Sequence, residues 1–278
     1  MSSAGVKTRL PVIRIVGNAL VAMLALAALI GTLWTPYDPL AISIPARLQP
    51  PSGAHLLGTD EFGRDVLSRI LAGASASVWF CLATVACAIG AGSIIGILAG
   101  YLRGWVDQTI MIVNDALLAF PGILLALALM VVMGANSVGM VLALSLAFIP
   151  VVVRVVRGVV LSLREKEYVE ASLVMGNSQI VTMARHILPN CVAPVTVLAT
   201  AMFGWVLLTE SALSFLGLGV PPPAPTWGNM LASSRPFMGS AFWLGLFPGL
   251  CISLALLGTN LFGDALRDRF DPRMGTAR

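Results

Sequence analysis

The chain has 278 residues, of which 58% are hydrophobic and 11% are charged. Soluble domains carry about 25% charged residues, so this composition excludes an ordinary water-soluble fold. The net charge of +4 does not indicate a nucleic acid partner. The basic residues stand at the ends of apolar runs, where they orient a membrane protein, and they form no basic stripe.

Six apolar stretches are long enough to cross the hydrocarbon core of a bilayer, which takes about 20 helical residues. They are Val12 to Trp34, Ala76 to Tyr101, Ile110 to Met133, Val138 to Val160, Val192 to Leu216 and Ala241 to Phe262. Because backbone groups cannot stay unpaired in lipid, each stretch is predicted to be a helix.

The first stretch is longer than the apolar core of a cleaved signal peptide, about 7–15 residues, so we expect it to remain as an anchor. The expected fold class is an all-α polytopic membrane protein with about six transmembrane helices. We divide it into an anchor helix with an external segment, residues 1–75, and a core of five helices, residues 76–278.

The basic residues are distributed unequally over the two sides of the membrane. With a cytoplasmic N-terminus, 13 of the 17 fall on the cytoplasmic side: Lys7, Arg9, Arg14, Arg103, Arg154, Arg157, Arg164, Lys166, Arg185, Arg267, Arg269, Arg273 and Arg278. The other side receives Arg47, Arg64, Arg69 and Arg235. Because Lys and Arg favour the cytoplasmic side, we expect both termini in the cytoplasm.

Three connections are too long for simple turns and are therefore expected to contact partners. Thr35 to Ser75 is predicted to be external, Leu161 to Cys191 cytoplasmic, and Gly217 to Ser240 external and rich in proline. The first of them contains the run LGTDEFGRD over residues 57–65. Asp60 is predicted to be a helix N-cap, with Asp65 and Arg69 on one helical face. The alternative is a capped interfacial helix with no special role.

Charged residues within the spans need polar partners, because each costs about 2.5–3.5 kcal/mol at a helix centre. Asp115 in the third span and Glu210 in the fifth either face a passage or bond a neighbouring helix, and we favour the interhelix role. Arg154 and Arg157 end the fourth span, where long side chains can reach the headgroups, and we favour a structural role for them as well. Pro121 is expected to kink the third span.

The connection between the fourth and fifth spans carries the clearest pattern. Residues 165–175 are good helix formers, Gly176 suits a tight turn, Ser178 can cap a second helix, and Pro189 is expected to end it. The sequence therefore predicts two short helices joined at a glycine. An alternative is an amphipathic connector lying on the inner leaflet.

The spacing of Glu170, Ala171, Gly176, Leu188 and Pro189 in residues 161–191 resembles the EAA loop of ABC-importer permeases. In that motif Ser172 stands where a second alanine is usual, and His186 where isoleucine is usual. The form HILPN is similar to that of the peptide and nickel branch of the family. Further runs resemble its C-type permeases: WTPYDP at 34–39, LGTDEFGRD at 57–65, AFP at 119–121, SFLGLG at 214–219 and GDALRD at 263–268.

The resemblance implies a type I ABC importer permease fold in a bacterial cytoplasmic (inner) membrane. It implies three kinds of protein partner in the lipid bilayer or on its two sides. These are a homologous B-type permease subunit in a heterodimer, two cytoplasmic ABC ATPase subunits and an extracytoplasmic solute-binding protein. Coupling to the ATPase falls to the EAA loop residues, Glu170, Ala171, Ser172, Gly176, His186, Leu188 and Pro189. Asp60, Arg64 and Asp65 are assigned to an external gate or a binding-protein contact. The implied substrate is a di- or oligopeptide, with nickel or a metal chelate as the alternative.

Catalytic signatures are missing from the sequence. No GxxxxGK[ST] phosphate loop is present, since the only lysines, Lys7 and Lys166, do not follow glycine. His55 and His186 lie on opposite predicted faces, so no metal site is expected, and the four cysteines are interpreted as packing residues. We therefore expect no cofactor in this chain and no enzyme activity, with ATP and Mg²⁺ bound by partners. Two other functions stay as alternatives. An ion-driven secondary transporter would need two related halves, which the sequence does not show. A membrane enzyme would need a set of catalytic residues, which is also not found.

Overall fold

The computed structural model describes residues 9–134, 136–221 and 223–270; the basic residues Lys7, Arg273 and Arg278 used above lie outside these ranges. The helices are α2 (Arg9–Leu33), α3 (Val66–Leu102), α4 (Gly104–Leu118), α5 (Gly122–Met133), α6 (Ser137–Arg164), α7 (Glu167–Val174), α8 (Gln179–Thr182), α9 (Leu188–Phe215), α10 (Trp227–Ser234) and α11 (Trp243–Phe270). Short 3₁₀ turns, η1 (Ile44–Ala46) and η3 (Arg235–Phe237), and a π-helical turn, η2 (Met183–Ile187), complete them.

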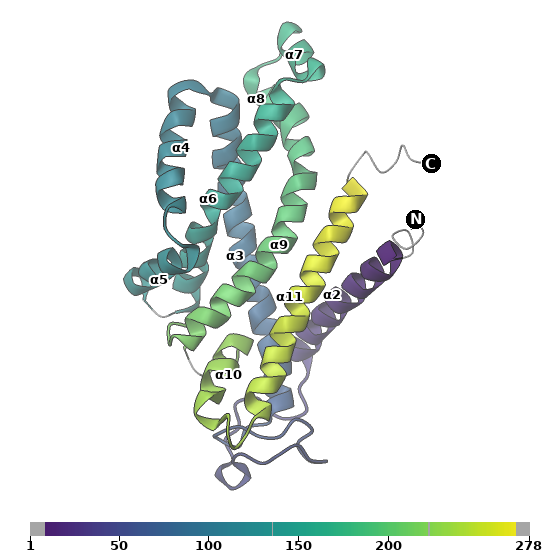
Figure 1. Ribbon diagram of the computed structural model, residues 1–278, viewed down its shortest axis with the longest axis vertical. Helices are drawn as coiled ribbons and strands as arrows, with labels where there is room; N and C mark the ends of the chain where they lie inside the picture. The colour runs from purple at the N-terminus through teal and green to yellow at the C-terminus, as the bar shows by residue number, and fades with distance from the viewer. Residues whose placement is uncertain (1–8, 135, 222, 271–278) are drawn as a thin grey trace, which may run out of the picture.

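Membrane-crossing helices dominate the described part of the chain. Five helical stretches in it are long and apolar enough to cross a bilayer, and α4 with α5 can form a sixth, bent crossing. This confirms the predicted fold class. Figure 1 shows α7 and α8 at one end of the bundle, with α10 and the segment between α2 and α3 at the opposite end.

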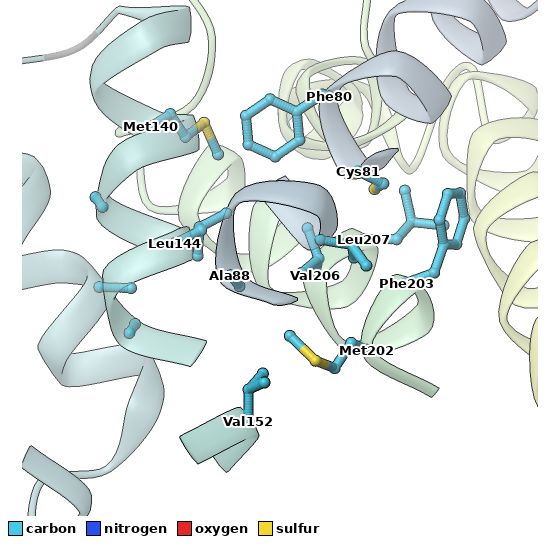
Figure 2. Packing of buried hydrophobic residues seen from close by; sticks show 14 of the residues in the cluster. Phe80, Cys81, Ala88, Met140, Leu144, Val152, Met202, Phe203, Val206 and Leu207 are labelled. Carbon is cyan, nitrogen blue, oxygen red and sulfur yellow. The ribbon is translucent and has the colours of Figure 1, made fainter. Parts of the chain in front are cut away.

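The bundle is held together by close packing of α3 on α6. A Cβ added to Gly92, Gly96 or Gly100 would come within 2.6–2.9 Å of valine side chains of α6. Small residues let transmembrane helices approach closely, which strengthens their dispersion contacts. Beside this seam, α9 adds Met202 and Val206 to the same buried cluster (Figure 2). The core therefore lies between α3, α6 and α9.

The second span begins ten residues earlier than predicted, at Val66 instead of Ala76. The apolar run was judged to start after Arg69, but this arginine is only 5% exposed and its charge is paired within the chain. The proposed division at residue 75 therefore falls inside α3.

The third span is broken, where the sequence predicted a kink. α4 and α5 meet at 93°, and Pro121 stands at the break as the N-cap of α5 with an extended ψ of 128°. Proline has no N–H to continue the helix. α5 has 12 residues, and at 1.5 Å per residue it is about 18 Å long, too short to cross a bilayer alone.

The proline-rich connection after α9 contains a helix that was not predicted. Thr226 caps α10 by accepting a hydrogen bond from the Asn229 N–H at 3.1 Å. Trp227 follows and donates its indole N–H to the carbonyl of Ile70, 3.0 Å away on α3. Threonine is a preferred N-cap residue, so Thr226 was the one signal for this helix in the sequence.

Candidate functional site

The connection between α6 and α9 forms two short helices, as predicted. α7 covers Glu167–Val174, within two residues of the predicted start and one of the predicted end. Gly176 has a φ of +85°, the left-handed conformation that favours glycine. Ser178 caps α8 by accepting a hydrogen bond from the Val181 N–H at 3.3 Å. The glycine turn and the cap thus fix the angle between the two helices.

Ser172 joins the two short helices. Its hydroxyl lies 3.1 Å from the hydroxyl of Thr182 on α8 and accepts a hydrogen bond from the side-chain amide of Asn177, also at 3.1 Å. Ser172 is 1% exposed and Thr182 is fully buried. Because a buried hydroxyl without a partner is costly, these bonds favour a single arrangement of α7 on α8, and the helices form one unit.

Pro189 does not end the second helix, and that prediction was wrong. Residues Gln179–Phe215 form one continuous helical stretch through α8, η2 and α9. The π turn makes this possible, because the Leu188 N–H donates to the carbonyl of Met183, five residues back. The side-chain amide of Asn190 donates to the His186 carbonyl at 2.7 Å. The loop is therefore joined to the fifth span by an uninterrupted helix.

The tip of this helical pair is apolar and exposed. Val174, Met175 and Ile180 are 81%, 76% and 73% exposed. Among the motif residues, Glu170, Ala171, Gly176, Leu188 and Pro189 are exposed, His186 is half-buried near Tyr168, and Ser172 is buried. A cluster of large exposed apolar side chains is typical of an interaction site.

At the opposite end of α9, Glu210 is bonded to hydroxyl groups. It is 1% exposed and accepts hydrogen bonds from Thr226 and Ser214 at 3.0 Å and from Ser211 at 3.4 Å. Thr226 is the N-cap of α10, so Glu210 connects α9 to the start of α10, where the helix dipole favours a negative charge. The geometry gives Glu210 an interhelix role.

Two ion pairs connect α4 to α6. Arg154 donates to Asp115 at 2.6 Å, and Arg157 makes two hydrogen bonds to Asp107, at 2.5 and 2.7 Å. These contacts agree with the structural role favoured for both arginines, because a carboxylate of α4 lies within contact distance of each guanidinium. The sequence contained Asp107 but offered no measure of its distance from α6. Asp115 thus also bonds a neighbouring helix, but it is 56% exposed.

Several charged side chains of the external segment are buried. The carboxylate of Asp60 accepts backbone N–H bonds from Phe62 and Arg64 at 2.8 and 2.9 Å and lies 2.6 and 3.3 Å from the guanidinium Nε atoms of Arg64 and Arg69. Asp60 is therefore the centre of a turn, and its prediction as a helix N-cap was wrong. Figure 1 shows this segment beneath α3 and α11.

The N-cap of α3 is Asp65 instead. Its carboxylate accepts bonds from the Ser68 N–H and hydroxyl, each at 2.8 Å, and lies 2.9 Å from Nδ1 of His55. Asp60, Arg64 and Asp65 are 4%, 8% and 3% exposed. Their assignment to an external gate or binding-protein contact stays a prediction. In the structure their side chains are buried in contacts within the segment.

In the part of the chain that the structure describes, no group of three or more His, Cys, Asp or Glu side chains is placed to hold a metal ion. The described residues do provide a helical pair with an exposed apolar tip that continues through one helix into a span. These features define a class of protein: a polytopic helical membrane protein with an exposed helical pair at one end of its bundle.

Comparison with known proteins makes the class specific. Residues 92–276 match the family described as "Binding-protein-dependent transport system inner membrane component". The match covers more than half of the chain, and the protein belongs to this family.

Individual relatives agree over nearly the whole chain. The chain is 43% identical to a putative peptide transport system permease protein of Brucella suis, over 93% of this chain and 87% of the relative. It is 42% identical to the dipeptide transport system permease protein DppC of Alkalihalophilus pseudofirmus, over 94% and 86%. It is 37% identical to the nickel transport system permease protein NikC of Escherichia coli, over 92% and 93%.

Family membership settles the general activity. The chain is the multi-pass permease component of an ABC importer in the inner membrane, it is not catalytic, and ATP is bound by partner ATPases. It works with a binding protein, as the family description states. The interpretations as an ion-driven secondary transporter or as a membrane enzyme are set aside on this ground.

Proposed function

We propose that residues 161–191 are the coupling loop, docking in a cleft of a cytoplasmic ATPase and carrying its closure into the membrane. One observation carries the proposal: a hydroxyl-bonded helical pair with an apolar exposed tip continues without a break into α9. A surface that only rested on lipid headgroups would not need to be joined stiffly to a span.

The path of the motion follows from the contacts. A displacement of α7 and α8 moves α9 with them, because the helix continues past Pro189. The turn η2 keeps it continuous through the hydrogen bond from the Leu188 N–H to the Met183 carbonyl. At the far end, Glu210 passes the displacement to Thr226 and thus to α10. Closure of the ATPases then changes the external end of the permease, where a passage opens to the binding protein.

The assembly is a heterodimer of this chain with a homologous B-type permease, two ATPase subunits and an extracytoplasmic binding protein. Both termini and the coupling loop face the cytoplasm. The distribution of Lys and Arg supports this orientation. The loop and the external segment lie at opposite ends of the bundle, which agrees with docking on opposite sides of the membrane (Figure 1).

The substrate is a di- or oligopeptide. Two relatives at 43% and 42% identity are named as peptide or dipeptide permeases. Nickel or a metal chelate is the second candidate, because a nickel permease is 37% identical over a similar length. Uptake of a radiolabelled dipeptide and of radiolabelled nickel by the same vesicles decides between them.

The coupling proposal is tested by Glu170→Arg in the complete importer, reconstituted with its binding protein. Glu170 is exposed on α7, so the change does not disturb the interior, but a reversed charge at a docked surface removes a contact and adds a repulsion. We expect uptake and binding-protein-stimulated ATP hydrolysis to fall at least about tenfold, a change of roughly 1.4 kcal/mol.

The matched control is Asp264→Arg, a charge reversal at an exposed position of α11, outside residues 161–191. We expect it to retain most of the activity, so that net charge alone cannot explain the loss. Normal coupling in Glu170→Arg would show that α7 does not dock on the ATPase.

A further inference from the structure

The Asp115–Arg154 pair is the most exposed ion pair in the described part of the chain. Each side chain is 56% exposed, although they are 2.6 Å apart. In the neighbouring pair, Asp107 is 15% and Arg157 28% exposed, and Glu210 is 1% exposed. Arg14 and Asp268, which pair between α2 and α11, are 42% and 34% exposed, less than Asp115 and Arg154.

The pair lies well inside its two helices. Arg154 is ten residues before the end of α6 at Arg164, about 15 Å at 1.5 Å per residue. Asp115 is eleven residues after the start of α4 at Gly104, about 16 Å on the same measure. Both residues therefore lie within helical stretches that are apolar enough to cross a membrane, and away from their ends.

Two adjacent features exclude lipid as the neighbour of this surface. Charged side chains within a span face a bundle interior or a water-filled cavity, because lipid does not solvate them. The break between α4 and α5 follows three residues after Asp115, and Phe120 in it is 61% exposed. Irregular backbone at membrane depth is tolerated only against protein or water.

We propose that Asp115 and Arg154 are a contact site of the water-filled passage for the charged ends of a peptide, which rests on the peptide-import function proposed above. The carboxylate of Asp115 accepts hydrogen bonds from the ammonium end. The guanidinium of Arg154 binds the terminal carboxylate through its planar set of donors. When the zwitterionic peptide binds, Asp115 and Arg154 give up their contact with each other and pair with the two charged ends of the peptide. Neither side chain is then left without a counter-charge.

The first experiment compares the two ion pairs in the complete reconstituted importer. Asp115→Asn and Arg154→Gln are expected to lower the ratio of dipeptide imported to ATP hydrolysed about tenfold, the effect of losing one charge-assisted hydrogen bond. The matched controls Asp107→Asn and Arg157→Gln remove the less exposed pair. They are expected to lower the amount of assembled importer and to leave this ratio unchanged in the complexes that form.

The second experiment measures water access. In a chain whose four cysteines are replaced by alanine, Asp115→Cys is expected to react with a water-soluble thiosulfonate and to be protected by dipeptide during turnover. Asp107→Cys is the control, expected to react at least about tenfold more slowly because its site is covered.

The proposal is overturned if Asp115→Asn impairs assembly as Asp107→Asn does, or if Asp115→Cys does not react, since the pair is then covered by the partner permease. Failure of the peptide-import function itself is distinguishable. In that case the wild-type importer moves no dipeptide, and the ratio for every variant is zero.

Discussion

The external segment and the coupling loop are long connections at opposite ends of the bundle, and their charged side chains differ in burial. In the external segment, Asp60 and Arg69 are buried against each other. In the coupling loop, Glu170 and the apolar tip at Val174 and Met175 are exposed. The first region pairs its charges within the chain, whereas the second exposes the surface that we propose docks on the ATPase. Substitutions in the first should therefore affect stability, and in the second coupling.

The largest expected effect is that of Asp60→Ala. It leaves the guanidinium groups of Arg64 and Arg69 buried without their carboxylate, and breaking a buried ion pair costs about 3–5 kcal/mol. We expect most of the chain to be lost before assembly, with any purified importer unfolding at a lower temperature. The measurements are the yield of complex by size-exclusion chromatography and a thermal unfolding curve.

Glu170→Ala is the matched truncation in the coupling loop. Its carboxylate is exposed, so we expect stability within about 0.5 kcal/mol of the wild type. Equal stability of the Asp60 and Glu170 variants would remove the distinction between the two regions.

Substitution of one glycine by alanine in each region tests the same difference between the external segment and the coupling loop. Gly63 and Gly176 have φ of +74° and +85°, where a side chain costs about 1–2 kcal/mol. A Cβ on Gly63 would also overlap the carbonyl oxygen of Ser43, whereas nothing lies within 4 Å of one on Gly176.

We therefore expect Gly63→Ala to lower the unfolding temperature clearly. Gly176→Ala should change it little and should mainly reduce ATPase coupling, by shifting the angle between α7 and α8. Unfolding temperature and binding-protein-stimulated ATP hydrolysis, measured on both variants, test the distinction. A strong loss of stability in Gly176→Ala alone would reverse it.

The smallest expected effect is the pH dependence of stability that Glu61 causes in the external segment. Burial raises the pKa of Glu61 above its ordinary value of 4.5, despite the guanidinium of Arg64 at 3.5 Å. A raised pKa in the folded state means that the contribution of Glu61 to stability is fully present below about pH 4.5 and is lost as the pH rises through the raised value.

Glu61→Gln should therefore raise the unfolding temperature slightly at pH 7, and this gain should vanish near pH 4. Unfolding curves of both proteins across that range provide the measurement. A gain that is independent of pH would show that ionisation of Glu61 is not its cause.

Much of the fold was predictable because the hydrocarbon core imposes a length on every apolar run. The first, fourth and sixth spans were located in this way, and the helical pair after α6 followed from Gly176 and Ser178. The errors occurred where a polar residue was satisfied by a distant partner. The second span was taken to start after Arg69, although Asp60 pairs with Arg69 and α3 already begins at Val66.

Pro189 was taken to end a helix because the rule for proline considers only the missing N–H. The π turn at η2 supplies the Leu188 N–H to Met183 instead, and the helix continues. The pairing of Asp107 and Asp115 with arginines of α6 was likewise beyond a single sequence, since those residues are 50 and 39 positions apart.

The sequence by itself determined which segments cross the membrane, the pattern of the coupling loop and the family to which the chain belongs. These properties depend on composition and on short spacing, which are local. Only the tertiary structure decided that Glu210 is enclosed by hydroxyls and that Asp115 is exposed beside Arg154. Burial and charge pairing depend on which helices meet, here α9 with α10 and α4 with α6, and helix contacts are not local in the sequence.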